Sequence, residues 1–226
     1  MIEWVFGKKK SFSDLDIPTS IQEVRRRSRI LIIDDEEPAL AADLRAASLS
    51  VDHVHDITKN NITIVEQEIY DLILLDYGNV GRSFGEDEGL SLLRHIKRVN
   101  PAVIIIAYTS KALKIKHSDF YRLTDGSLSK DAGIQESLEK IEGHLKKAHS
   151  IHDIWNDLLG RCNITPGSKE DLKLQDRVLR SYSKGTKKMK IIRELQEFSE
   201  SEDGKKAIYA LIAKSIQLIT SSMGVN

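Results

Sequence analysis

Residues 29–37 read RILIIDDEE, an apolar run that ends abruptly in four carboxylates. Continuous runs of β-branched and leucine side chains are typical of strands covered on both faces, as in a parallel sheet between layers of helices. Neighbouring carboxylates repel one another by about 1 to 4 kcal/mol per close pair. The stretch therefore predicts a buried strand that leads into a site where negative charge must be offset.

Similar apolar runs recur up to about residue 148 and alternate with stretches of helical spacing. This alternation predicts an α/β fold, in which a doubly wound, five-stranded parallel sheet has helices on both sides. The expected strands end near Ile33, His55, Asp76, Tyr108 and Lys130, and the expected helices cover residues 38–47, a short piece after Thr63, 88–98 and 112–122.

Polar side chains follow four of the expected strands at the point where each strand ends. In open α/β sheets the ligand crevice lies beyond the carboxyl ends of the strands, so these side chains should converge on one shallow site. A divalent cation there would offset the repulsion between the carboxylates. The converging side chains are Asp34, Asp35, Asp76, Thr109 and Lys130.

This ordered set resembles the receiver domain of two-component response regulators, and the resemblance covers slightly more than half of the chain. It implies a flavodoxin-like receiver fold. It further implies that Asp76 is the phosphoacceptor and that Thr109 and Lys130 contact the phosphoryl group. Mg²⁺ would be held by Asp76 together with Asp34, Asp35 and the backbone carbonyl of Gly78.

The resemblance also implies partners and a mode of action. A histidine kinase or a phosphotransfer protein would phosphorylate Asp76, and the modified aspartate would switch an attached output module. Such a receiver is not an enzyme acting on other substrates, because it assists only its own phosphoryl transfer and dephosphorylation.

Three departures from the family pattern are visible. The segment YGNVGRSFGEDEG at 77–89 is several residues longer than the usual loop, and we expect this acidic, glycine-rich insertion to be mobile and to shield the site. Ser127 stands where the family usually has an aromatic residue, and Asp131 stands where it usually has a proline. We therefore expect the conventional output route to be altered.

The segment after the expected sheet has apolar residues at alternating intervals of four and three, which is the spacing of a coiled coil. One interpretation is a continuous helix over about 133–160 that forms a dimer seam. The other is that the first part packs on the sheet and a separate domain begins after a break near Ser150. The positions concerned are Ile134, Leu138, Ile141, Leu145, Ala148, His152, Trp155 and Leu159.

Three more helices are expected at 169–182, 187–198 and 205–221, the first with Ser168 as its N-cap. They would form a helical module for dimerisation or partner binding. An alternative is a DNA-binding transcription regulator that uses these helices, with the basic run KGTKKMK at 184–190 as a phosphate contact. A further alternative is a receiver-like scaffold that does not switch.

Composition limits the partners. Lysine plus arginine and aspartate plus glutamate both number 34, so no overall positive field draws the chain to nucleic acid or to an anionic membrane. The single cysteine, Cys162, excludes an internal disulfide. The opening MIEWVFGKKK is the reverse of a signal peptide, and no apolar run approaches the roughly 18 residues of a membrane span. We expect a cytoplasmic protein without a membrane partner.

These observations divide the chain into three expected segments. The first is an N-terminal arm over 1–28, in which the basic stretch EVRRRSR from Glu23 reads as solvated linker and to which no function is assigned. The second is the receiver domain over 29–148. The third is the helical module over 149–226.

Overall fold

The computed structural model describes residues 20–67, 69–110, 118–161, 163–183 and 202–222. The chain divides into two compact units. The sheet unit is Thr19–Ala148, and the helical unit is His149–Asn226 together with Met1–Pro18.

The sheet unit contains five strands in the order β2-β1-β3-β4-β5, and every neighbouring pair is parallel. This is the strand order of flavodoxin-like doubly wound folds. The predicted fold class is therefore confirmed. The strands are β1 (Arg29–Ile33), β2 (Ser50–Val54), β3 (Leu72–Leu75), β4 (Ile104–Thr109) and β5 (Gly126–Ser129).

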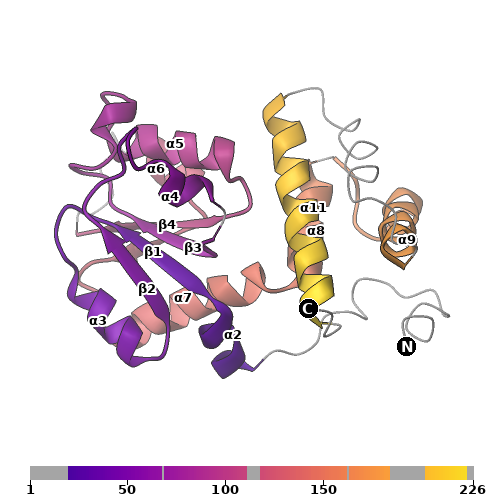
Figure 1. Ribbon diagram of the computed structural model, residues 1–226, viewed down its shortest axis with the longest axis horizontal. Coiled ribbons are helices and arrows are strands. Elements are labelled where there is room, and N and C mark those ends of the chain that lie inside the picture. Colours follow the sequence, from indigo (N-terminus) through magenta and orange to yellow (C-terminus); the bar gives the residue numbers. More distant parts are fainter. Residues whose placement is uncertain (1–19, 68, 111–117, 162, 184–201, 223–226) are drawn as a thin grey trace. The chain divides into compact units, whose positions relative to one another are not determined.

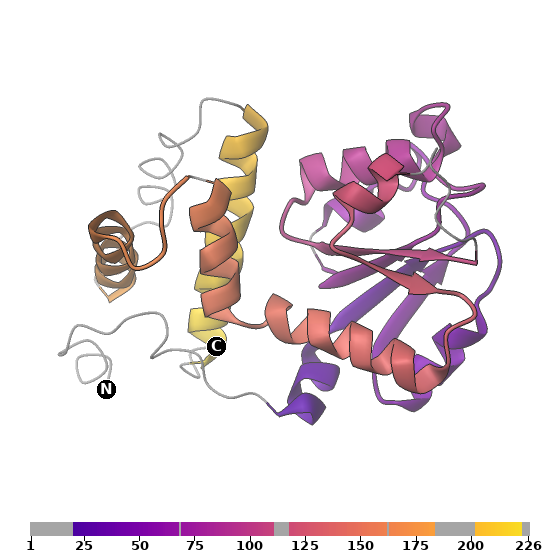
Figure 2. The same cartoon turned by 180° about the vertical axis from the view of Figure 1, so that it is seen from behind.

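Helices cover both faces of the sheet (Figures 1 and 2). Along β1, Ile30 and Ile32 enter the core on one face, whereas Leu31 and Ile33 enter the core on the other. A strand buried on both sides needs apolar residues at every position, which explains the continuous run. One face carries α3 (Ala39–Ala46) and α7 (Ile134–Ala148); the other carries α4 (Thr63–Glu66), α5 (Gly89–Val99) and α6 (Ser118–Leu123).

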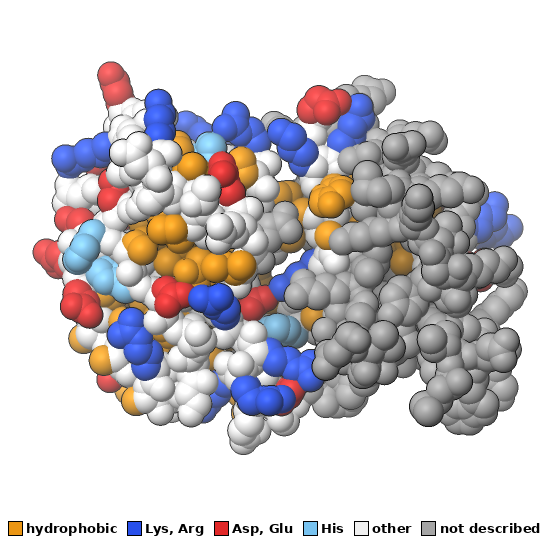
Figure 3. Space-filling model, viewed as in Figure 1, with side chains coloured by type: hydrophobic (Ala, Val, Ile, Leu, Met, Phe, Trp, Pro, Cys, Tyr) orange, Lys and Arg blue, Asp and Glu red, His pale blue; other side chains and the backbone are white. Residues whose placement is uncertain are grey.

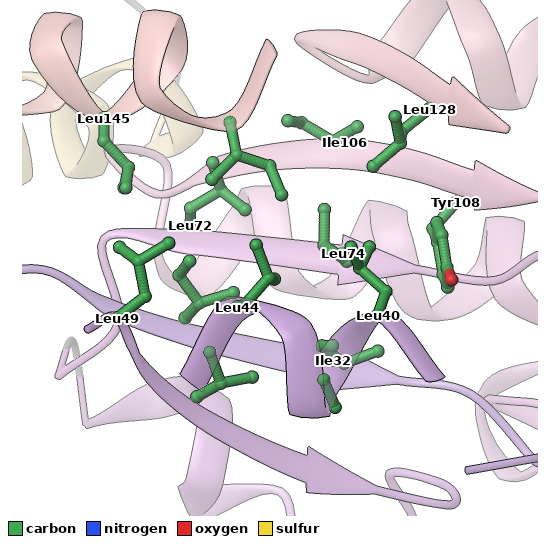
Figure 4. Packing of buried hydrophobic residues seen from close by; sticks show 14 of the residues in the cluster. Ile32, Leu40, Leu44, Leu49, Leu72, Leu74, Ile106, Tyr108, Leu128 and Leu145 are labelled. Carbon is green, nitrogen blue, oxygen red and sulfur yellow. The ribbon is translucent and has the colours of Figure 1, made fainter. Parts of the chain in front are cut away.

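The core under α3 and α7 is well filled. Figure 4 shows Leu40 and Leu44 of α3 beside Ile32 of β1 and Leu74 of β3. On the opposite face, α4 has only four residues and contributes the buried Val65 to the core. In the view of Figure 3, hydrophobic side chains gather at the surface of the sheet unit. Ile69, in the segment between α4 and β3, is 38% exposed.

A short helix, α2 (Ile21–Arg27), precedes β1 within the sheet unit. Ser20 caps it by accepting a hydrogen bond from the N–H of Glu23, and Val24 is buried in the core. Arg25 donates to Glu142 of α7 at 2.7 Å. The interpretation of this basic stretch as solvated linker was therefore wrong, since one buried valine and one cross-helix ion pair attach it to the sheet unit.

The helical conformation is interrupted at His149 and Ser150, between α7 and α8 (Ile151–Arg161). Ser150 caps α8, because its Oγ accepts from the N–H of Asp153 at 3.1 Å. The continuous-helix interpretation was therefore wrong. Five of the eight positions on the proposed seam are buried within the chain: Ile141, Leu145, Ala148, Trp155 and Leu159.

In the helical unit, α8 packs along α11 (Glu202–Ser222) (Figures 1 and 2). Ser168 caps α9 (Lys169–Ser183), as predicted, by accepting from the N–H of Asp171 at 3.2 Å. The expected helix at 187–198 and the basic run at 184–190 lie outside the described residues. Among the helices that are described, none has the length and apolarity needed to cross a membrane.

A buried aspartate ties α8 to α9. Asp171 is only 2% exposed, and its Oδ1 accepts from Trp155 Nε1 and from Gln175 Nε2, both at 2.8 Å. Its Oδ2 accepts from the N–H of Gly167 at 2.7 Å. Both oxygens of this carboxylate are thus satisfied by neutral donors.

Candidate functional site

Three carboxylates meet where β1 and β3 end. Asp34 and Asp35 follow β1, and Asp76 directly follows β3. The register pairs Ile33 with Leu75, and the N–H of Asp76 donates to the carbonyl of Ile33 at 2.9 Å. One carboxylate oxygen from each aspartate lies within 4.8 Å of the other two. The predicted convergence of these three side chains is therefore present in the structure.

Lys130 brings a cation to this cluster from the end of β5. Its Nζ lies 2.7 Å from Asp34 Oδ2 and 2.9 Å from Asp76 Oδ2. The ring of Tyr108 lies below the ammonium group, with its centroid 5.6 Å from Nζ, a distance at which the face of the ring attracts a cation. One ammonium therefore bridges two carboxylates.

The charges of the site shift one another's pKa values. Burial raises the pKa of Asp76, and it outweighs the opposing effects of the hydrogen bonds from Lys130 and from the N–H of Tyr77. Burial alone would lower the pKa of Lys130, but its contacts with Asp34 and Asp76 outweigh this effect and raise it. Lys130 accordingly stays charged at neutral pH.

Asp34 is the most deeply buried acid of the cluster, at 1% exposure. Its Oδ1 accepts from the N–H of Glu36 at 3.1 Å. Its Oδ2 has no hydrogen bond, so the contact with Lys130 is an ion pair without hydrogen-bond alignment. Three convergent carboxylates beside a single ammonium leave an excess of negative charge, and they are the oxygen ligands that hard divalent cations prefer. The residues present therefore fit such a cation.

Thr109, at the end of β4, lies at the same edge of the sheet. Its carbonyl accepts from the N–H of Lys130 at 3.1 Å, and its side chain shares a hydrogen bond with Tyr121 of α6. The negative charge of Asp76 contributes to raising the pKa of Tyr121, after burial, which is the larger cause. Gly78 follows Asp76 by two residues, and the role of its carbonyl as a metal ligand stays a prediction.

Two histidines of β2 and the residues after it contact the backbone carbonyls of Asp34 and Asp35. His53 Nε2 lies 2.9 Å from the carbonyl oxygen of Asp34, and His55 Nδ1 lies 3.2 Å from that of Asp35. Sequence reasoning found no site role for either. The two histidines reach these carbonyls because the register of β2 against β1 pairs Ile32 with His53. This register cannot be recognised from the sequence.

The long loop after Asp76 makes several contacts within the sheet unit, and its mobility and its shielding of the site stay predictions. It contains a short 3₁₀ helix, η2 (Arg82–Phe84), and it closes where the N–H of Gly89 donates to the carbonyl of Tyr77 at 3.0 Å. Val80 is fully buried, and the Phe84 ring lies 4.9 Å from the ring of His95. Sequence reasoning missed the contacts that this loop makes with the site.

No family model matches the sequence. No curated protein matches it either.

Solved structures do match, among them receiver domains and response regulators. A CheY-like receiver domain protein from Methanospirillum hungatei is 24% identical, covers 54% of this chain and 95% of its own, and has a TM-score of 0.45. The signal receiver domain of an HD domain-containing protein from Pseudomonas fluorescens is 19% identical, covers 61% and 98%, and has a TM-score of 0.48. A two-component response regulator from Clostridium difficile is 22% identical, covers 53% and 96%, and has a TM-score of 0.45. These are similarities in fold.

Proposed function

We propose that this chain is a response regulator of a phosphorelay, in which Asp76 accepts a phosphoryl group with the help of Mg²⁺. The supporting observation is the buried Asp34 oxygen that has no hydrogen bond, beside Asp76 and Lys130 at one edge of a parallel sheet. Mg²⁺ would be held by Asp34, Asp35 and Asp76, with the carbonyl of Gly78 as a further ligand. When bound, it would supply positive charge next to the oxygens of the transferring group.

Asp76 is the nucleophile in this proposal. One of its carboxylate oxygens attacks the phosphorus of a phosphohistidine, carried by a histidine kinase or a phosphotransfer protein. The new O–P bond forms as the P–N bond breaks, and the electron pair of that bond returns to the imidazole ring. The product is an acyl phosphate on Asp76. Its side chain is 12% exposed, so part of the carboxylate is accessible to the donor.

Lys130 and Thr109 act on the transferred group. Lys130 already lies 2.9 Å from Asp76, so its charge is in place when negative charge spreads over the phosphoryl oxygens. Thr109 exchanges its hydrogen bond with Tyr121 for one with a phosphoryl oxygen. A phosphoryl group brings about −1.5 to −2 charges and strong acceptors, which are sufficient to draw a hydroxyl and its loop toward it.

The output belongs to the helical unit. We assign it to dimerisation or to binding of a protein partner through α8, α9 and α11, in the cytoplasm. Beyond its own phosphoryl transfer and dephosphorylation, the chain catalyses no reaction in this proposal.

The test uses acetyl phosphate and Mg²⁺ as the donor mixture and intact mass as the readout. Wild type should gain the mass of one phosphoryl group, and Asp76→Asn and chelator-treated wild type should gain none. Asp71→Asn is a matched control, because Asp71 is as buried as Asp76 but precedes the same strand instead of following it. A gain of mass in Asp76→Asn, or none in wild type, would refute the proposal, and the latter result would favour a receiver-like scaffold that does not switch.

A further inference from the structure

Asn79 connects the long loop to the acidic cluster. Its side-chain amide donates to Asp35 Oδ2 at 2.9 Å. Its Oδ1 accepts from Arg82 Nη2 at 2.5 Å, and its backbone N–H donates to Glu88 Oε2 at 3.1 Å. Glu88 Oε1 in turn accepts from Arg82 Nε at 3.1 Å. Asn79, Arg82 and Glu88 therefore form a closed ring of hydrogen bonds. The Asn79 amide links this ring to Asp35.

The two neighbours of the Asn79 amide determine its orientation. A guanidinium can only donate hydrogen bonds, and an ionised carboxylate can only accept them. Arg82 must therefore face Oδ1 and Asp35 must face Nδ2, so both contacts select the same orientation. If Arg82 were absent, only Asp35 would hold the amide in place.

The backbone of the loop suits this arrangement. Asn79 has a φ of 60°, in the left-handed region that asparagine and glycine adopt more readily than other residues. Glycine at this position would keep the backbone and remove only the amide. The site thus offers a substitution that isolates the contact between Asn79 and Asp35.

The ring adds little to the stability of the fold. The Arg82 side chain is 63% exposed and that of Glu88 is 30% exposed, and ion pairs this close to solvent contribute about 0 to 1 kcal/mol. Asp35 itself is exposed, so its carboxylate would otherwise rotate freely. The effect of the ring is therefore on the position of Asp35.

We propose that Asn79, held by Arg82 and Glu88, is a positioning residue for the cation site: it binds one oxygen of Asp35 and leaves the other for the cation or its bound water. This inference rests on the proposed function, because it assumes that Asp35 helps to hold Mg²⁺. Carboxylates that bind metals are commonly oriented by such outer hydrogen bonds, and losing one typically weakens metal binding by about 10- to 100-fold. The loop insertion thereby sets the affinity of the site.

The test measures the dissociation constant of Mg²⁺ alone by calorimetric titration of the full chain. Asn79→Gly should weaken binding about tenfold or more. Arg82→Ala should weaken it by a smaller factor. In the double variant the effect should equal that of Asn79→Gly alone, because Arg82 acts only through the Asn79 amide.

Two controls separate positioning from general damage. Arg26→Ala removes another exposed arginine that pairs with a glutamate three residues away, on α2 and before β1, and it should leave Mg²⁺ affinity unchanged. In an Asp35→Asn background, Asn79→Gly should have no further effect on the affinity.

The outcomes distinguish this inference from the proposed function. If wild type binds no Mg²⁺, the proposed function fails with it. If wild type binds Mg²⁺ and Asn79→Gly binds it equally well, or if Asn79→Gly still weakens binding in the Asp35→Asn background, the positioning role alone is overturned.

Discussion

Asp34 and Asp171 are two aspartates buried to almost the same degree, with 1% and 2% of their surfaces exposed. Asp171, in the helical unit, receives three hydrogen bonds from neutral donors, and each of its oxygens has at least one. Asp34, in the sheet unit, has one oxygen with no hydrogen bond and shares a single ammonium with Asp76. The same side chain is thus fully satisfied in one place and incompletely satisfied in the other.

The difference separates a structural carboxylate from one that is available to a ligand. A buried charge surrounded by donors stabilises the fold as it stands, whereas a buried charge short of partners is costly until something binds to it. Their exposed fractions alone would not distinguish the two aspartates. What distinguishes them is the inventory of donors around each oxygen.

The largest effect is expected for Asp171→Ala. The substitution leaves Trp155 Nε1, Gln175 Nε2 and the N–H of Gly167 without their acceptor, and it should lower the free energy of unfolding of the helical unit by about 3 to 5 kcal/mol. Urea unfolding followed by Trp155 fluorescence, in a Trp4→Phe background, measures this. Glu170→Ala, an exposed neighbour in the same first turn of α9, should cost less than about 1 kcal/mol. Equal effects of the two substitutions would refute the structural role of Asp171.

The next effect concerns Asp34→Asn and Mg²⁺. Without metal, the substitution should change the free energy of unfolding of the sheet unit little, because the repulsions from Asp35 and Asp76 that it removes offset the ion pair with Lys130 that it breaks. Mg²⁺ at about 100 times its dissociation constant should stabilise wild type by about 2.7 kcal/mol, and this gain should be lost in the variant. Thermal unfolding with Mg²⁺ and with chelator tests both statements. A large destabilisation in chelator would place Asp34 in the same structural class as Asp171.

The smallest effect is expected at the hydrogen bond between Tyr121 and Thr109. Tyr121→Phe frees the Thr109 hydroxyl, so phosphorylation of Asp76 no longer has to break a bond worth about 0.5 to 1.5 kcal/mol. The rate of phosphorylation by acetyl phosphate should rise by a factor of roughly 2 to 10. Thr109→Val should abolish the difference between tyrosine and phenylalanine at position 121. An unchanged rate in Tyr121→Phe would show that the two hydroxyls are independent in the reaction.

The sheet and the residues of the site could be predicted because both depend on local pattern. Buried parallel strands are apolar at every position, and polar residues at their carboxyl ends must lie at one edge of the sheet. Asp34, Asp76 and Lys130 were found in this way without knowledge of any contact. The donors around each oxygen could not be found, because they come from residues far apart in the chain.

The elements that were misjudged carry weak or ambiguous local signals. In α2 a single buried residue, Val24, lies among arginines, so the stretch resembles a solvated linker. The spacing of apolar residues from Ile134 to Leu159 suits one long helix as well as two shorter ones, and only the cap formed by Ser150 decides between them. The ring around Asn79 has no sequence signature at all.

Gly89 gives the long loop a property beyond its contacts. A side chain at this position would begin 2.5 Å from the carbonyl oxygen of Asp76, and the residue's N–H already binds the carbonyl of Tyr77. The two ends of the loop, Tyr77 and Gly89, therefore lie next to each other where α5 begins. Because closing a longer loop costs only about 0.6 kcal/mol for each doubling of its length, such a segment can be exchanged for a shorter or longer one while Asp76 and α5 stay in place. Under the function proposed above, the loop is therefore a part of the chain in which cation affinity can change without any change in the phosphoacceptor, as long as the buried Val80 is kept.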